Sequence, residues 1–152
     1  MASSAGRGRT VLQGGREKAF RPLPETDRRR AFAAGVDAYE RGDFFEAHEI
    51  LEPAWMGTDD PAERALLQGL IKVAAAYVHD VRGNPAGIVR NLEGARVLLV
   101  RALETGPARN VAGIDLGVLL DAIDARLTDL TAHPDGPTLG PPAFARTSRS
   151  AR

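Results

Sequence analysis

The chain has 152 residues, 43% of them hydrophobic and 26% charged, which is the size and balance of one folded domain. Because it contains no cysteine, the sequence excludes disulfide bonds and thiolate metal sites, so a metal would need His, carboxylate or carbonyl ligands. No apolar run reaches the roughly 18–20 residues of a membrane span, and the first residues form no apolar signal segment. We therefore expect a cytoplasmic protein with no membrane partner.

The formal net charge is zero but is spread unevenly along the chain. Residues 1–30 carry eight Lys/Arg and three Asp/Glu, for +5, whereas residues 31–130 carry nine and sixteen, for −7. Residues 131–152 carry three and one, for +2. Basic tails can contact nucleic acid. These tails lack the interleaved aromatics and the dense basic block of such proteins, so nucleic acid is not a favoured partner.

Composition divides the chain into three parts. Residues 1–26 are rich in Gly, Pro and Arg and are predicted to form an extended basic arm, with a polyproline-like stretch at 21–24. Residues 27–131 are predicted to form the folded domain. Residues 132–152 resemble the arm in composition and are predicted to be a disordered basic tail that contains His133.

Start and stop signals predict five helices in this domain. The expected helices span residues 27–41, 43–56, 60–81, 84–103 and 115–130. The second starts at Asp43, with Glu46 three residues on, as in a capping box in which Asp replaces Ser or Thr. The third starts at Asp60 as N-cap, followed by Pro61, and the fifth starts from Asp115. No strand pattern competes with the helical periodicity. The predicted fold class is all-α, a compact bundle of about five helices formed from antiparallel helical hairpins.

The second expected helix carries a polar stripe on a face that should meet the core. At 100° per residue, one face holds Phe44, His48, Leu51, Glu52 and Trp55. His48 and Glu52 lie one turn apart, close enough to share a proton, a metal or a ligand. Because burying a carboxylate without a partner is costly, Glu52 should have one.

The third expected helix offers that partner. Its apolar surface is interrupted by a stripe made of Gln68, Lys72, Ala75 and His79. The chain uses Arg eighteen times and Lys only twice, and the ammonium of Lys72 is compact and readily changes its pKa, so it could pair with Glu52. We expect these two helices to face each other, with His48, Glu52 and Trp55 opposite the polar residues of that stripe.

The polar cluster has a structural and a functional interpretation. It can be a satisfied core histidine beside a buried Glu52–Lys72 salt bridge that sets the helix register. Alternatively, His48 and Glu52 can ligate a divalent metal. The metal pattern is incomplete, because Glu52 takes the place of the second His of H-E-x-x-H and the paired E-x-x-H elements of di-iron bundles are missing. No phosphate loop, dinucleotide fingerprint or nucleophile elbow is present.

The segment FFEAHEILEPAW at 44–55 resembles the H-x-x-x-E-x-x-W motif of the bacterial and archaeal domain of unknown function 309 family. The segments LQGLIK at 67–72, GNPAG at 83–87 and RPLP at 21–24 are similar to the same family, and the resemblance covers about residues 20–104. It implies a compact all-α bundle in which His48, Glu52 and Trp55 are signature positions. Members have been catalogued as metal-dependent hydrolases on prediction, which the resemblance extends to this chain as an expectation.

Three functions follow as hypotheses. The leading one is a cytoplasmic helical-bundle protein whose polar pocket binds a divalent metal or a small ligand; the pocket residues are His48, Glu52, Trp55, Gln68 and Lys72. The second is a metal-dependent hydrolase, in which His48 and Glu52 ligate the metal, Glu49 or a second carboxylate is the general base and Lys72 stabilises negative charge. The third is a helical interaction module with a purely structural cluster. For a homo-oligomer, the helix at 115–130 or the outward Ile50 is a candidate dimer face.

Overall fold

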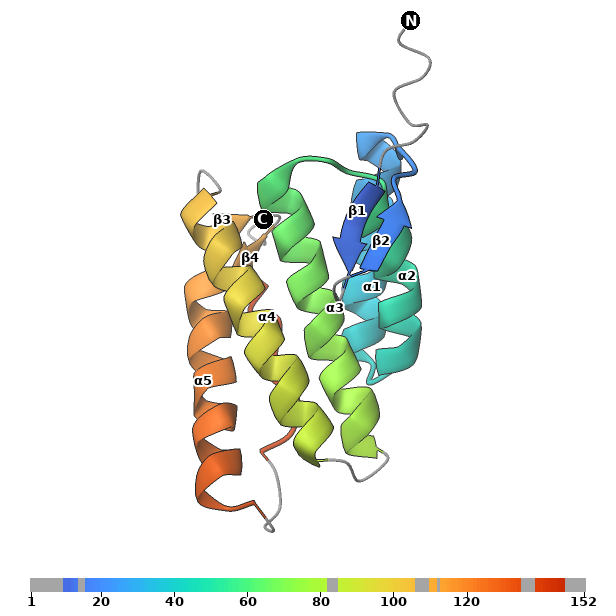
Figure 1. The fold of residues 1–152 in the computed structure, drawn as a ribbon. Helices are drawn as coiled ribbons and strands as arrows, with labels where there is room; N and C mark the ends of the chain where they lie inside the picture. The colour runs from blue at the N-terminus through green and yellow to red at the C-terminus, as the bar shows by residue number, and fades with distance from the viewer. Residues whose placement is uncertain are drawn as a thin grey trace, which may run out of the picture.

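The fold is an all-α bundle of five helices, as the sequence predicts (Figure 1). The computed structural model describes residues 10–13, 16–81, 85–105, 110–111, 113–134 and 139–146. The helices are α1 (Glu25–Glu40), α2 (Phe44–Met56), α3 (Pro61–Val81), α4 (Pro85–Thr105) and α5 (Leu116–Ala132). None of the described helices is both long enough and apolar enough to cross a membrane.

Two of the three predicted helix starts with an acidic cap form as expected. The Asp60 carboxylate accepts a hydrogen bond from the Glu63 amide at 2.8 Å, and Asp115 accepts one from the Val118 amide at 3.2 Å. Asp43 does precede α2, but its carboxylate makes no capping bond and instead lies 3.4 Å from the Arg41 guanidinium. The predicted capping box is therefore not formed, because a nearby cation takes the carboxylate.

Two short strand pairs, which the sequence did not predict, accompany the helices. β1 (Thr10–Gln13) pairs antiparallel with β2 (Arg16–Ala19), with Thr10 opposite Ala19. β3 (Asn110–Val111) pairs antiparallel with β4 (Ile114–Asp115). The first hairpin lies inside the segment predicted to be an extended arm. Its signal in the sequence is Gly14-Gly15 between two four-residue runs, a dipeptide that suits a two-residue hairpin turn.

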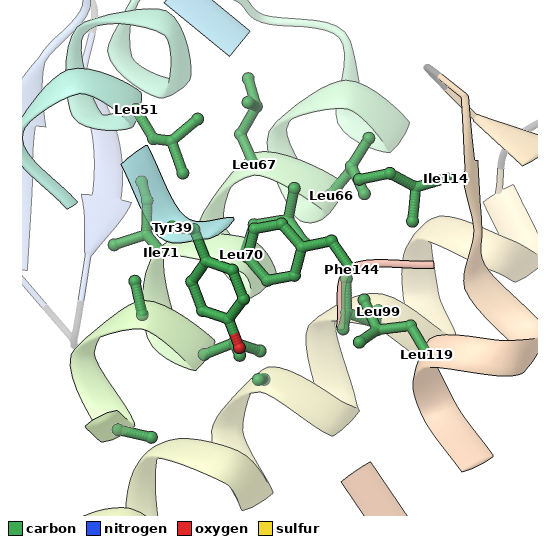
Figure 2. Packing of buried hydrophobic residues seen from close by; sticks show 14 of the residues in the cluster. Tyr39, Leu51, Leu66, Leu67, Leu70, Ile71, Leu99, Ile114, Leu119 and Phe144 are labelled. Atoms are coloured by element: carbon green, nitrogen blue, oxygen red, sulfur yellow. The ribbon is translucent and has the colours of Figure 1, made fainter. Parts of the chain in front are cut away.

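The helices pack in chain order, each against the next, and α3 makes its largest contact with α4. Close approach depends on two glycines within helices. A Cβ on Gly35 of α1 would lie 2.5 Å from the Leu51 side chain of α2, and one on Gly69 of α3 would lie 2.6 Å from that of Leu99 on α4. Leu51, Leu70 and Leu99 belong to one continuous core (Figure 2).

The C-terminal strap (residues 139–146) also packs against the bundle. Phe144 is fully buried, and its ring stacks on that of Tyr39 with centroids 3.7 Å apart (Figure 2). The Tyr39 hydroxyl donates a hydrogen bond to the Pro142 carbonyl at 2.6 Å. The strap lies beyond residue 131, where the sequence predicts the folded domain to end, and one buried aromatic anchors it to the bundle.

Candidate functional site

The lead-in segment (residues 21–24) runs along the C-terminal end of α2. The Arg21 amide donates to the Met56 carbonyl and the Leu23 amide to the Gly57 carbonyl, both at 3.0 Å. These bonds occupy carbonyls near the helix end, where intrahelical partners run out. A Cβ on Gly57 would lie 2.5 Å from the Leu23 Cβ, so glycine is needed here for the close approach of the two segments.

An open groove of about 580 Å³ lies between the lead-in segment and α2. It is lined by Arg21, Pro22, Leu23, Glu49, Glu52, Pro53 and Met56. Two carboxylates and one guanidinium therefore share the groove with apolar side chains. Glu52 is the one lining residue that the sequence analysis assigned to the polar pocket, and it is half-buried.

His48 lies next to Glu49, one of the residues that line the groove. Its side chain is 28% exposed, and its Nδ1 is 3.6 Å from the Glu49 carboxylate, an ion pair whenever the imidazole is protonated. The buried Nδ1 has no hydrogen-bond partner among the described residues. The ring of Phe45, which is 62% exposed, lies parallel to the imidazole with centroids 6.5 Å apart. His48 and Glu49 thus form one polar unit beside the groove.

Trp55 is a core residue. Its side chain is fully buried in the hydrophobic cluster, and it does not line the groove. Its indole Nε1 is buried with no hydrogen-bond partner among the described residues. An unpaired buried N–H costs about 1–3 kcal/mol, so Trp55 is held in place by apolar packing.

The residues expected from α3 lie elsewhere. The Lys72 side chain extends toward α4, where its Cδ, Cε and Nζ would lie 3.1, 3.4 and 3.7 Å from a Cβ on Gly94. Gln68 is half-buried on α3. His79 falls in the last turn of α3, and its side chain is outside the described part of the structure. Lys72 therefore occupies the contact between α3 and α4, whereas Glu52 lines the groove beside α2.

Metal ligation by His48 and Glu52 would need further ligands. Protein zinc sites use three or four protein ligands. The described side chains contain no group of three or more His, Asp or Glu that could hold a metal ion. The two predicted ligands thus lack a third described partner, and the described geometry does not match a metal centre.

A half-buried polar network, which no sequence pattern predicts, fixes the lead-in segment. Arg28 of α1 donates to both carboxylate oxygens of Glu63, at 2.9 and 3.2 Å, and also to the Leu23 carbonyl. The buried Thr58 hydroxyl donates to Glu63 at 2.9 Å. The hydrogen bond with Glu63 raises the pKa of Arg28. Because Arg28 and Glu63 are 35 residues apart, no local pattern signals this network.

Residues 32–91 match the model of a protein family described as "Domain of unknown function (DUF309)". The matched segment runs from α1 into α4 and contains His48, Glu52 and Trp55. A search of curated proteins gives no match.

Proposed function

We propose that this chain, whose residues 32–91 belong to the domain of unknown function 309 family, binds a small zwitterion with an apolar body. The proposed ligand class is a free apolar amino acid or a close analogue. The proposed site is the groove between α2 and the lead-in segment. The proposal keeps the hypothesis of a small ligand that the sequence suggests. Glu52 belongs both to the polar pocket predicted from the sequence and to this groove.

The observation that carries the proposal is the pairing of opposite charges in one groove. Glu49 and Glu52 can accept hydrogen bonds from a ligand ammonium, and the Arg21 guanidinium can donate two parallel bonds to a ligand carboxylate.

The remaining lining suits an apolar ligand body. Leu23, Pro53 and Met56 line the same groove, so an aliphatic side chain placed there would leave water. The groove's volume of about 580 Å³ falls within the roughly 300–1,000 Å³ of ordinary small-molecule sites. His48 is assigned a positioning role, because its Nδ1 lies 3.6 Å from the Glu49 carboxylate and can hold that carboxylate when protonated.

The test is titration calorimetry with three matched probes: L-leucine, 3-methylbutylamine and 4-methylpentanoate. The amine lacks the carboxylate of leucine and the acid lacks its ammonium. We expect leucine to bind best, and each truncated probe to bind about tenfold more weakly because one charge-assisted contact of about 1.4 kcal/mol is lost.

Variants assign each contact. Glu49→Gln should weaken the binding of leucine and of the amine but leave the binding of the acid unchanged. Arg21→Gln should weaken the binding of leucine and of the acid only. Glu46→Gln is the matched control, since Glu46 lies on the same helix, pairs with Arg41 at 3.9 Å and does not line the groove. No heat with any apolar amino acid, or equal losses in Glu46→Gln and Glu49→Gln, would contradict the proposal.

A further inference from the structure

The C-terminal strap connects α5 to α1 through polar contacts along its whole length. The Arg126 guanidinium of α5 donates to the Gly140 carbonyl at 2.8 Å. The Tyr39 hydroxyl of α1 donates to the Pro142 carbonyl at 2.6 Å. At the far end, Arg146 pairs with Asp37 at 3.2 Å and with Glu40 at 3.3 Å, both on α1. We call the surface that receives the strap the socket; it consists of Asp37, Tyr39, Glu40, Ile114, Asp115 and Arg126.

These contacts are those by which proteins recognise peptides. The Asp115 amide donates to the Ala145 carbonyl at 2.9 Å and Ile114 forms a single antiparallel bridge with Arg146, so the end of the strap pairs with β4 through its backbone. Phe144 is the buried aromatic anchor, stacked on Tyr39 (Figure 2).

A third contact involves proline. Pro141 and Pro142 line a surface hollow of about 400 Å³ together with Tyr39 and Phe44, and the Pro142 carbonyl accepts the hydrogen bond from Tyr39. Proline-rich segments dock on aromatic-lined surfaces because their backbone is already ordered before binding. The strap therefore combines a backbone bridge to β4, a buried aromatic anchor and two prolines next to an aromatic-lined hollow within eight consecutive residues.

We propose that the socket is a peptide-binding site, that its ligand is residues 139–146, and that two copies of the chain exchange this segment. The residues that contact the socket all lie within 139–146, so the whole segment can make the same contacts with the socket of another copy. Only four residues, 135–138, separate the strap from residue 134 after α5. Short connections to a terminal element favour exchange between copies. An intramolecular strap acts at an effective concentration of roughly millimolar, so exchange needs a concentrated protein or a weakened internal contact.

A charge swap on exposed residues tests the exchange. The variant R146E opposes a carboxylate to Asp37 and Glu40 within its own chain, and the variant D37K/E40K opposes two ammonium groups to Arg146. When the two variants are mixed and exchange straps, both straps meet a socket of opposite charge. We expect each variant alone to sediment as a monomer, and a mixture at about 100 µM to form a heterodimer enriched about tenfold over either homodimer, an enrichment that salt weakens.

The peptide itself gives the second measurement. A fluorescein-labelled peptide of residues 139–146, LGPPAFAR, is titrated into full-length wild type and full-length Phe144→Ala. We expect the variant to bind at least about 100-fold more tightly, because its own strap has lost the buried ring that otherwise fills the socket. If Phe144→Ala is unfolded by circular dichroism, the R146E chain replaces it, with tighter peptide binding than wild type again expected. A peptide with Ala in place of Phe144 should not bind.

Each outcome is decisive. Peptide binding together with heterodimer formation supports the proposal. A folded variant that does not take up the peptide overturns the binding site, and a mixture that remains monomeric overturns the exchange between copies. Failure of either leaves the calorimetry at the α2 groove unaffected, because Arg21, Glu49 and Glu52 do not belong to the socket.

Discussion

Tyr39 links the strap to the bundle through both its ring and its hydroxyl. Burial raises the pKa of this phenol above its ordinary value of about 10. Below pH 10 the phenol is protonated in the folded and the unfolded chain. Above pH 10 the unfolded chain loses the proton while the folded chain keeps it. The free energy of unfolding therefore falls as pH rises, by up to about 1.4 kcal/mol per pH unit from this group.

We expect Tyr39→Phe to reduce the decrease in the free energy of unfolding above pH 10. At pH 7 the variant should lose about 0.5–1.5 kcal/mol, because the hydrogen bond to the Pro142 carbonyl is missing. By about pH 11 the difference between the two proteins should have shrunk by about 1 kcal/mol. Urea unfolding between about pH 8 and pH 11 measures both curves. Parallel curves for the two proteins would show that the Tyr39 phenol does not stay protonated in the fold.

Residue-scale features were predictable from the sequence where they are local. The caps at Asp60 and Asp115 depend on residues three positions apart, and they form as expected. The capping box at Asp43 fails because a second local partner, Arg41, competes for the carboxylate. The Tyr39–Phe144 stack joins residues more than a hundred positions apart, so no periodicity indicates it.

At the scale of elements, the α3–α4 contact contains two glycines with opposite roles. A Cβ on Gly69 would lie 2.6 Å and 2.8 Å from core atoms of Leu99. The three atoms nearest to a Cβ on Gly94 all belong to the flexible side chain of Lys72, at 3.1, 3.4 and 3.7 Å. We expect Gly69→Ala to destabilise by about 1–3 kcal/mol through overpacking. Gly94→Ala should be neutral or stabilising by up to about 1 kcal/mol, because alanine favours the helix.

Both substitutions add one methyl group inside a helix of the same interface, so each controls for the other. Denaturant unfolding of the two variants and wild type gives the comparison. Equal effects of the two substitutions would mean that close approach at Gly69 is not what the α3–α4 contact requires.

The Arg28–Glu63–Thr58 network should stabilise the junction of α1, α3 and the lead-in segment. Because Glu63 accepts from both partners in a half-buried place, we expect Glu63→Gln to lose about 1 kcal/mol. The control is Arg29→Gln, which breaks an exposed pair with Glu25 on α1 and should cost at most about 0.5 kcal/mol. Thermal unfolding of the two variants gives the comparison. An equal loss of stability in both would show that the network does not stabilise this junction.

The packing of the elements explains why sequence patterns predict only part of the site. Periodicity correctly put Trp55 on the buried face of α2. Lys72 belongs to the α3 stripe, but its side chain extends toward α4, where Gly94 leaves room for it. The groove needs the lead-in segment as its second wall, and that wall comes from hydrogen bonds to carbonyls at the end of α2, which have no signature in the sequence.

At the scale of the whole molecule, the strap contributes part of the core. We expect Phe144→Ala to lose about 3–5 kcal/mol, a large share of the roughly 5–15 kcal/mol that stabilises a domain. The matched control is Phe45→Ala, which removes the same ring from a position 62% exposed and should change stability by no more than about 0.5 kcal/mol. Guanidinium unfolding provides the measurement. A small loss in Phe144→Ala would mean that the strap is not part of the cooperative fold.

The groove is the centre of the functional account, and Met56 reports on it directly. The chain has two methionines, Met1 and Met56, and Met56 lines the groove. With methyl-¹³C-methionine labelling, Met56→Leu assigns the signals. We expect L-leucine to shift the Met56 methyl signal in a saturable way, and 3-methylbutylamine and 4-methylpentanoate to shift it only at higher concentration. R21Q/E49Q should abolish the response to leucine. A Met56 signal that leucine leaves unmoved, or moves equally in R21Q/E49Q, would contradict ligand binding in this groove.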